Sequence, residues 1–347
     1  MPPKHQEASK SQLGLKELAA HVGLSQATVS RIINQSATTH RIAAKTQQRV
    51  LEAAAALNYK PNMFARALRN KRSFTVGVII PEISEGYSTS VLGGIEDVLL
   101  LSGFFYFVVS HRHRKELLLE YPRLLLSRAV EGVIAVDSVI EEDLPVPVVA
   151  LSSHSRRKSI VNIELDHLLA ARYALDHLHK LGHRNIAFIK GQTFSSDTRL
   201  RWQAICKVAA DLGIFIDARL IVQLEGPGLG LEPGRTATVK LLERNVPFSA
   251  IFAFNDLSAM GAIIALQEAG IKVPAQVSVV GFDDILSAAT NNPALTTVRQ
   301  PLNEMGRIAA TTLLQLIQGD STNKPKTPIR VLPTFVERQS TSVAPQL

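Results

Sequence analysis

The sequence predicts a small all-α module over residues 14–60, followed over residues 75–347 by a larger α/β domain with parallel sheets. The first region holds three segments whose apolar residues recur every three or four positions, as on one face of a helix. After Phe74, apolar runs of strand length alternate with helical patterns, which is typical of a parallel sheet covered by helices. The α/β region has about 270 residues, more than one small sheet requires, so we expect two lobes.

Three helices are predicted in the all-α module. Leu15 to Val22 form the first, and Gly23 breaks its pattern. Ser25 is a good N-cap for a second helix, which runs from Gln26 to about Asn34. A polar loop follows, and a third helix is expected from about Ala43 to Leu57.

In the α/β region, predicted strands and helices alternate along the chain. The apolar runs place strands at 76–80, 105–109, 132–136, 146–151, 186–189, 250–254 and 277–281. Helical spacing places helices at 90–101, 165–181, 200–212, 234–243 and 257–269. We expect residues 1–13 to be a disordered tail and residues 61–74 to hold a helical segment too short to be stable alone, followed by a basic linker.

The composition excludes several classes of protein. Hydrophobic residues make up 46% of the chain and charged residues 20%, which rules out wholesale disorder. A single cysteine, Cys206, excludes a disulfide framework. No apolar run reaches the ~18 residues of a membrane span, and the first 40 residues lack the apolar core of a signal peptide. We therefore expect a cytoplasmic protein with no membrane partner.

The positive charge is concentrated at the N-terminal end. The chain carries a net charge of +8, and residues 1–74 hold twelve Lys and Arg against three Glu, a net charge of +9. The remainder is close to neutral. A basic module on a near-neutral body is typical of nucleic-acid binding, although a solvated basic face or a membrane-surface segment has the same charge.

The pattern around Gly23 favours nucleic acid. Two short helices joined at a glycine read as a helix-turn-helix, whose second helix enters the major groove of DNA. Val29 and Ile32 would anchor that second helix, and its outward side chains are predicted to be Gln26, Ala27, Thr28, Ser30 and Arg31. Gln and Arg pair with adenine and guanine edges, whereas an ordinary helical hairpin needs no such exposed set.

Several strings together resemble the lactose-repressor (LacI/GalR) family. In the N-terminal module they are LAAHVGLSQATVSRIIN (18–34), LNYKPN (57–62) and ARALR (65–69). In the body they are LGHRNIA (181–187), AIFAFND (250–256), VVGFDD (279–284) and LTTVRQP (295–301). The resemblance covers about residues 13–341, and the joint order and spacing of the strings make it specific.

The resemblance implies a regulator, expected to be a repressor, whose helix-turn-helix headpiece binds a near-palindromic operator in double-stranded DNA as a homodimer. Gln26, Ala27 and Arg31 match positions that read bases, and Ser25, Thr28 and Ser30 match positions that hold phosphates. Residues 62–69 match a hinge helix, in which Leu68 would wedge into a minor-groove step. The hinge residues expected to contact DNA are Asn62, Arg66, Leu68 and Arg69.

The body resembles a periplasmic-binding-protein-like domain with a small-molecule effector between its lobes, a sugar or sugar derivative. Lobe 1 is expected at about 75–165 and 299–330, and lobe 2 at about 166–298 and 331–347. The predicted effector-binding residues are Tyr87, Arg201, Asn255, Asp256 and Asp283. The last three also follow apolar strands directly, and ligands in open α/β sheets lie beyond the strand ends. The dimer face is expected on lobe 1, including residues 90–101. We expect a dimer rather than a tetramer, because the C-terminal residues show no heptad repeat.

Two departures from the family pattern are visible. The loop after Asn34 is longer than usual, and Ala43 stands where an N-capping serine is common. The stretch 228–232 lacks the aromatic residue that often stacks on the effector.

Other signals are weaker, and we predict no catalytic residues, no metal and no cofactor. His177, His179 and His183 suit helix-surface and capping roles, and residues 111–115 read as a solvated basic loop that could approach an anionic effector. The glycines of 226–230 lack the residues of a phosphate-binding loop. The alternatives are a transporter's solute-binding protein, which would need an export signal, and a sugar hydrolase using the cleft carboxylates.

Overall fold

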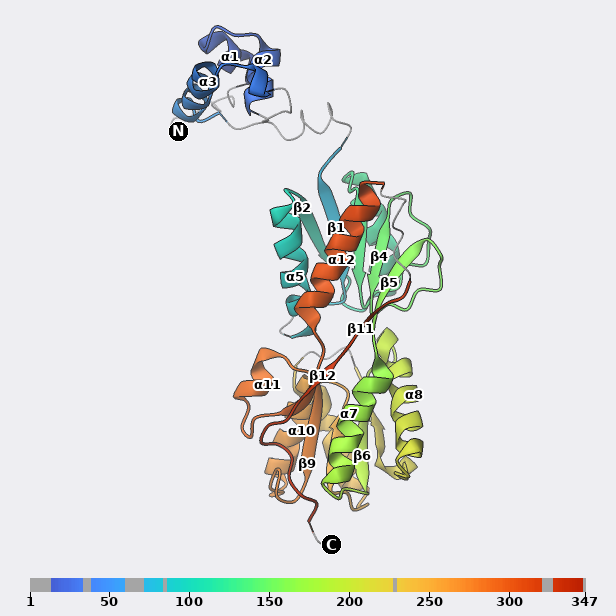
Figure 1. The fold of residues 1–347 in the computed structure, drawn as a ribbon. Helices are drawn as coiled ribbons and strands as arrows, with labels where there is room; N and C mark the ends of the chain where they lie inside the picture. The colour runs from blue at the N-terminus through green and yellow to red at the C-terminus, as the bar shows by residue number, and fades with distance from the viewer. Residues whose placement is uncertain are drawn as a thin grey trace, which may run out of the picture. The chain divides into compact units, whose positions relative to one another are not determined.

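The computed structural model describes residues 14–33, 39–59, 72–83, 86–226, 230–319 and 327–345 (Figure 1). The chain divides into two compact units, Met1–Ser73 and Phe74–Leu347. Each unit has buried apolar clusters of its own.

The first unit is the small helical headpiece that the sequence predicts. Its core is formed by fully or almost fully buried Leu18, Val29, Ile32 and Val50. Gly23 makes the turn between the first two helices with a φ of +64°, a conformation that glycine adopts without strain. The elements are α1 (Leu15–His21), α2 (Gln26–Ile33), the 3-10 helix η1 (Thr39–Arg41) and α3 (Ala44–Ala56).

The second unit contains two six-stranded sheets, one in each lobe. The first sheet has the order β11-β5-β4-β3-β1-β2 and is parallel throughout. Its strands are β1 (Thr75–Ile80), β2 (Phe105–Ser110), β3 (Gly132–Val136), β4 (Val148–Leu151), β5 (Ile160–Leu165) and β11 (Ile329–Val331).

The second sheet has the order β12-β10-β9-β8-β6-β7, in which only β12 is antiparallel to its neighbour. Its strands are β6 (Ile186–Lys190), β7 (Ile221–Gln223), β8 (Ala250–Ala253), β9 (Ser278–Asp283), β10 (Thr296–Arg299) and β12 (Thr334–Val336). The fold is thus a two-lobed α/β domain with parallel sheets, as predicted.

Helices cover both faces of each sheet (Figure 1). In lobe 1, α5 (Tyr87–Leu101) and α12 (Leu302–Ile317) share one core, and α6 (Lys115–Ser127) packs in the other. In lobe 2, α7 (His167–Lys180) and α8 (Ser196–Asp211) lie in one core and α9 (Glu232–Glu243) and α10 (Asp256–Glu268) in the other. Two short helices, η2 (Ala218–Leu220) and α11 (Leu286–Thr290), complete this lobe.

A close approach of backbones fixes α5 against α12. A Cβ atom added to Gly94 would lie 1.9 Å from the backbone oxygen of Asn303, and one added to Gly306 would lie 2.1 Å from that of Val91. Only glycine fits at these two positions, because any side chain would collide with the facing helix.

The chain passes between the lobes three times. It crosses after β5, again after β10, and a third time between β11 and β12, where two residues join the strands. In open parallel sheets, ligands bind beyond the carboxyl ends of the strands. The region where the chain crosses between the lobes is therefore where a ligand cleft is expected.

All seven predicted strands and all five predicted α/β helices are present, with ends shifted by a few residues. Strands β5, β7, β10, β11 and β12 and helices α6, α11 and α12 were not predicted. Four of these five strands, β7, β10, β11 and β12, have only three or four residues. Apolar runs of that length do not stand out from the surrounding sequence.

Candidate functional site

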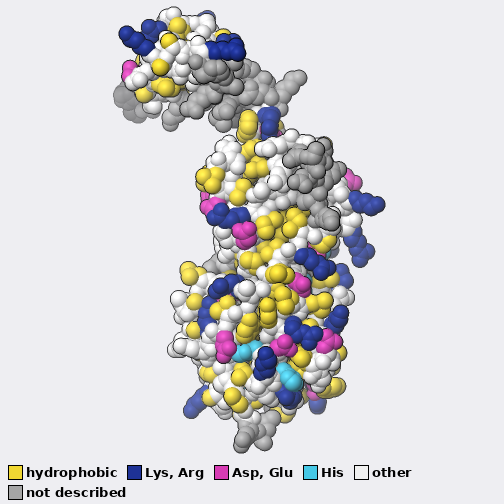
Figure 2. Space-filling view, viewed as in Figure 1, with side chains coloured by type: hydrophobic (Ala, Val, Ile, Leu, Met, Phe, Trp, Pro, Cys, Tyr) yellow, Lys and Arg dark blue, Asp and Glu magenta, His cyan; other side chains and the backbone are white. Residues whose placement is uncertain are grey.

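The outward side of α2 carries four of the ten residues predicted to contact DNA. Gln26, Ala27 and Arg31 are exposed, and Thr28 is half-buried. Ser25 caps the helix as predicted, because its Oγ accepts a hydrogen bond of 3.1 Å from the backbone N–H of Thr28. In Figure 2, Lys and Arg side chains are spread over the described surface of the headpiece, as its charge requires.

One DNA-contact prediction is wrong in orientation. Ser30 was expected to point outward and hold a phosphate, but it is 3% exposed. Together with Val29 and Ile32, it lies on the side of α2 that faces the headpiece core. Its polarity suggested an outward position, but its place beside Val29 on the helix decides its burial.

The longer loop after α2 is fastened by side-chain hydrogen bonds. Thr39 Oγ1 donates to the backbone oxygen of Arg31 at 2.9 Å, and Gln47 Nε2 donates to the backbone oxygens of Thr39 and Ile42. Ala43 provides no side-chain cap for α3. Instead, Arg49 Nη2 donates to the backbone oxygen of Val22 at 3.0 Å and ties α3 to the turn. The predicted hinge contacts Asn62, Arg66, Leu68 and Arg69 lie outside the described residues.

A cleft with a cavity volume of about 120 Å³ lies between the two lobes of the second unit. Four of the five predicted effector-binding residues line it: Tyr87, Arg201, Asn255 and Asp283. Tyr87 begins α5 in lobe 1, and the other three belong to α8, the end of β8 and the end of β9 in lobe 2. The strand-end argument thus placed Asn255 and Asp283 correctly.

The fifth residue, Asp256, does not line the cleft. It is fully buried behind the wall, where its carboxylate accepts hydrogen bonds from Thr297 Oγ1 at 2.6 Å and from the Ile285 backbone N–H at 2.9 Å. As the first residue of α10 it points back toward the sheet, so its role is to join α10 to β10 and the chain after β9.

Arg201 is held rigidly. Its Nη1 donates to the backbone oxygen of Phe254 at 2.5 Å and its Nη2 to Asp197 at 3.1 Å. The guanidinium carbon lies 3.7 Å from the ring centroid of Phe282, a cation–π contact. Its Nε has no hydrogen-bond partner within the described parts of the chain. The fork is therefore preorganised, and Nε–H and the second hydrogen of each terminal nitrogen are left over.

Tyr87 and Asn255 are also oriented by neighbours. The Tyr87 hydroxyl donates to Ser152 Oγ at 2.8 Å, and burial together with Asp197 and Asp137 raises its pKa well above the ordinary value. Asn255 caps α10, its Oδ1 accepting from the Ser258 backbone N–H at 2.9 Å.

Asp283 has an unusual environment. Its φ of +116° is a conformation that side-chain-bearing residues rarely adopt, and such positions concentrate at functional sites. Its Oδ1 accepts a hydrogen bond from Gln300 Nε2 at 2.6 Å. Burial raises the pKa of Asp283 to about 7, against the lowering effect of Arg201. Asp137, which follows β3, also lines the cleft, and burial and Asp197 raise its pKa to about 6.

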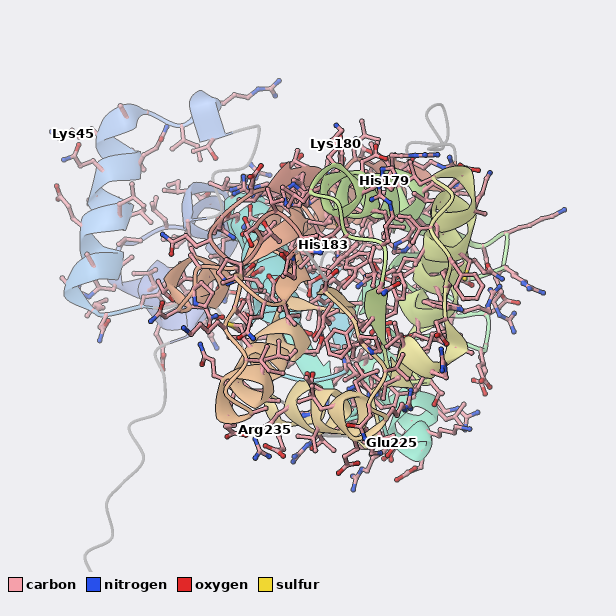
Figure 3. The ribbon with its side chains drawn as sticks, turned by 90° about the horizontal axis from the view of Figure 1, so that it is seen from below. Lys45, His179, Lys180, His183, Glu225 and Arg235 are labelled. Carbon is pink, nitrogen blue, oxygen red and sulfur yellow. The ribbon has the colours of Figure 1, made fainter. Side chains whose placement is uncertain are left out.

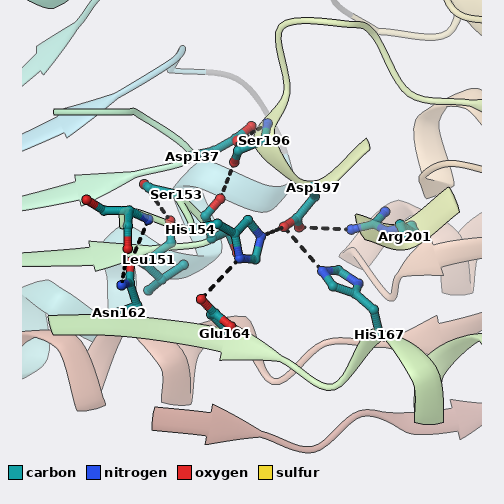
Figure 4. A network of polar contacts seen from close by, with 12 residues as sticks. Asp137, Leu151, Ser153, His154, Asn162, Glu164, His167, Ser196, Asp197 and Arg201 are labelled. Atoms are coloured by element: carbon teal, nitrogen blue, oxygen red, sulfur yellow. Dashed lines mark hydrogen bonds and ion pairs between the residues drawn. The ribbon is translucent and has the colours of Figure 1, made fainter. Parts of the chain in front are cut away.

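A polar network joins the lobes beside the cleft (Figure 4). The carboxylate of Asp197 lies 2.7 Å from His154 Nε2 and 3.3 Å from His167 Nε2, and it also binds Arg201. Glu164 lies 3.2 Å from His154 Nδ1. His154 and Glu164 belong to lobe 1, and Asp197 and His167 to lobe 2. Burial lowers the pKa of His154, but the bonds to Asp197 and Glu164 outweigh it and raise the pKa to about 9.

Several residues of this site were not predicted. Asp137 directly follows a predicted strand, so the strand-end argument should have included it. His154, His167, Asp197 and Gln300 offered no local signal, because their partners lie far away in the sequence.

The basic run 111–115 is not a solvated loop throughout. His111 is buried and bonded to Ser138 at 2.9 Å, and Lys115 begins α6. His113 reaches the cleft and stacks on Phe194 of the other lobe, with ring centroids 3.9 Å apart. This pair supplies aromatic surface at the cleft, although none is present at 228–232.

The other histidines have structural surroundings. His183 is fully buried and bonded to Ser249 Oγ and to the backbone oxygen of Ser342. His179 lies near it at the end of α7 (Figure 3).

Among the described residues, no helix is long and apolar enough to cross a membrane.

Known proteins match this chain over nearly its whole length. Residues 14–62 match the family "Bacterial regulatory proteins, lacI family", and residues 175–341 match "Periplasmic binding protein-like domain". The HTH-type transcriptional regulator DegA of Bacillus subtilis is 33% identical over 338 residues, covering 94% of this chain and 97% of DegA. The HTH-type transcriptional repressor CytR of Escherichia coli K12 is 28% identical, covering 92% and 93%.

Solved structures agree with these relatives. The lac repressor dimer bound to operator and the anti-inducer ONPF has a TM-score of 0.83 at 27% identity, covering 96% of this chain and all of that one. The transcriptional regulator CelR in complex with cellobiose has a TM-score of 0.68 at 27% identity, covering 94% and 99%. The headpiece, the two lobes and these relatives lead to one conclusion: the chain belongs to the LacI family of bacterial transcriptional regulators.

Proposed function

We propose that the protein is a repressor that binds a near-palindromic operator as a homodimer and reads bases with Gln26, Ala27 and Arg31 of α2. The observation that carries the proposal is the exposure of these three side chains on a helix whose other side is buried. Ser25 and Thr28 would hold phosphates at the start of the same helix. Leu68 of the hinge would wedge into the central minor-groove step.

The dimer is proposed to form through lobe 1. Leu100, Leu101 and Phe105 are 62%, 88% and 60% exposed at the end of α5 and on the edge strand β2. An exposed apolar patch of this kind is suited to burial against a second copy of the same face. The lac repressor structure, which is a dimer bound to operator, supports the proposal that the protein is a dimer.

The cleft is proposed to bind a small polyhydroxylated effector, a sugar or sugar derivative. Arg201 offers a fixed guanidinium fork, and Asn255 and Asp283 offer amide and carboxylate groups around the same space. An effector that binds one arrangement of the lobes better than the other would shift operator affinity by its differential binding energy.

We further propose that the cleft is a binding site without catalytic turnover, and that the protein acts in the cytoplasm. DegA and CytR carry the names of transcriptional regulators, which supports this assignment. Release of product from a panel of glycosides, lost in Asp283→Asn, would instead favour the hydrolase alternative.

The experiment is selection of bound sites from a random duplex pool at a fixed salt of ~150 mM, because phosphate contacts make affinity depend on salt. We expect a near-palindrome with a flexible central step. Arg31→Ala should then lose about 1–3 kcal/mol of discrimination at one base position of each half-site. If no sequence is enriched, with or without a metabolite extract, the protein does not read bases and the proposal is wrong.

A further inference from the structure

We propose that the effector is a polyhydroxylated primary amine, whose ammonium group binds at Asp283 and Gln300 within the field of Asp137. The inference rests on the proposed effector function of the cleft and narrows the class of ligand. It depends on how charges and hydrogen-bond acceptors are distributed over the cleft wall.

The charged side chains of the cleft are not all paired. The lining includes Glu82, His113, Asp137, Asp197, Arg201 and Asp283. Glu82 lies 3.5 Å from His113, and Asp197 is surrounded by Arg201, His154 and His167. Within the described parts of the chain, neither Asp137 nor Asp283 has a basic side chain within 4.0 Å.

Arg201 acts on Asp283 electrostatically and lowers its pKa, but its ion pair is with Asp197. Its two terminal nitrogens donate to Phe254 and Asp197, and its plane is stacked on Phe282. The neighbouring carboxylate makes the contrast clear. Asp284 is bonded to Arg299 and to Arg338, each at 2.6 Å. Two consecutive aspartates therefore differ: Asp284 is paired with two arginines, whereas Asp283 faces the cleft with no basic side chain within 4.0 Å among the described residues.

A second, independent observation comes from Gln300. It is 3% exposed and lines the cleft, and its Nε2 donates to Asp283. Its Oε1 is buried and has no donor among the described residues. A buried acceptor without a donor costs free energy that a ligand donor would recover. Asp283 and Gln300 thus lie side by side at the cleft, and the Oε1 atom of Gln300 has no donor among the described residues.

An ammonium group fits this wall better than a hydroxyl does. An ammonium has three donors and no acceptor, whereas each hydroxyl brings lone pairs that need donors of their own. It also supplies the positive charge that two buried carboxylates lack. The hydroxyl groups of the ligand would meet Asn255 and Arg201, which line the same cleft.

The test is calorimetric titration of the full chain with matched sugars at pH 7. The probes are glucosamine, galactosamine and mannosamine, each beside its parent hexose and its N-acetyl form, at up to millimolar concentrations. We expect one amino sugar to bind at least tenfold more tightly than its parent and its N-acetyl form. That preference should weaken as the pH is lowered from 7 to 5, because burial raises the pKa of both Asp137 and Asp283 and they become protonated.

Variants separate charge from shape. Asp283→Asn and, on the other lobe, Asp137→Asn should each remove most of the amine preference, measured as the ratio of the amino sugar's affinity to that of its parent hexose. Asp211→Asn, at an exposed pair with Arg172, is the matched control and should keep the preference. Circular dichroism checks that each variant is folded.

Equal or tighter binding of the neutral parent overturns the amine proposal and leaves the effector site intact. Binding of neither set also overturns it. The proposed effector function fails separately, if no ligand that binds the cleft changes operator affinity.

Discussion

Replacement of Asp283 by asparagine should make lobe 2 more stable at pH 8, although it removes a hydrogen-bonded, buried side chain. Asparagine keeps an oxygen that accepts from Gln300 and adds no charge. The wild-type carboxylate must ionise beside Asp197 and Asp137 in a buried site, which opposes folding at neutral pH.

The magnitude follows from the pKa difference. The pKa of Asp283 rises from 3.8 in an unfolded chain to about 7 in the folded protein. The folded state therefore holds the proton more tightly. The cost of ionisation is absent below pH 3.8, grows as the pH rises, and is complete above pH 7. At 1.36 kcal/mol per pKa unit, the cost reaches up to about 4 kcal/mol.

The assay is urea denaturation between pH 4.5 and 8, followed by the fluorescence of Trp202. The chain contains one tryptophan, on α8 of lobe 2, so the signal reports the lobe that contains Asp283. The gain of Asp283→Asn over wild type should grow with pH, and the exposed Asp211→Asn should stay within about 0.5 kcal/mol throughout. If the gain does not depend on pH, or if the variant is less stable at pH 8, ionisation of the Asp283 carboxylate does not destabilise the folded state and the reasoning is refuted.

Three further predictions concern helix packing, the interlobe network and the headpiece. Gly94→Ala should cost about 3 kcal/mol or more in denaturant titrations, because its Cβ would collide with the Asn303 backbone, whereas Gly93→Ala should be neutral or stabilising by up to about 1 kcal/mol. His154→Gln should lower stability most below pH 6.5 and progressively less as the pH rises through 9, since the raised pKa of His154 contributes stability only while the imidazole is charged; a flat difference across pH would contradict this. Ser25→Ala should lower the stability of the headpiece by about 1 kcal/mol, read from amide exchange in α2, and unchanged exchange would rule out the cap.

Most of the fold could be predicted because its central strands are long, buried on both faces and almost wholly apolar, as in Thr75–Ile80 and Gly132–Val136. The edge strands β7, β11 and β12 have three residues each and exist only through their neighbours. Helix α6 was missed because it follows a basic run and contains Pro122. These elements depend on tertiary contacts that a local pattern does not carry.

The site was predicted where a residue's place on its own element decides its role. Asn255 and Asp283 follow strands, and strand ends face the cleft. The predictions for Asp256 and Ser30 were wrong because both side chains are buried. A shift of one position along a helix is enough to turn a side chain from the solvent or the cleft to the interior. The pairing of His154 with Asp197 joins residues 43 positions apart in different lobes, so it had no sequence signal.

The third crossing has a consequence for how the protein is made. Strands β11 and β12 follow every other strand of both sheets and lie at an edge of their own sheet, one in each lobe. On the ribosome, neither lobe can therefore complete its sheet before the other has been synthesised. A single nascent segment of eight residues, Ile329 to Val336, adds the last strand to both sheets, so we expect the two lobes to reach their final stability together rather than in turn.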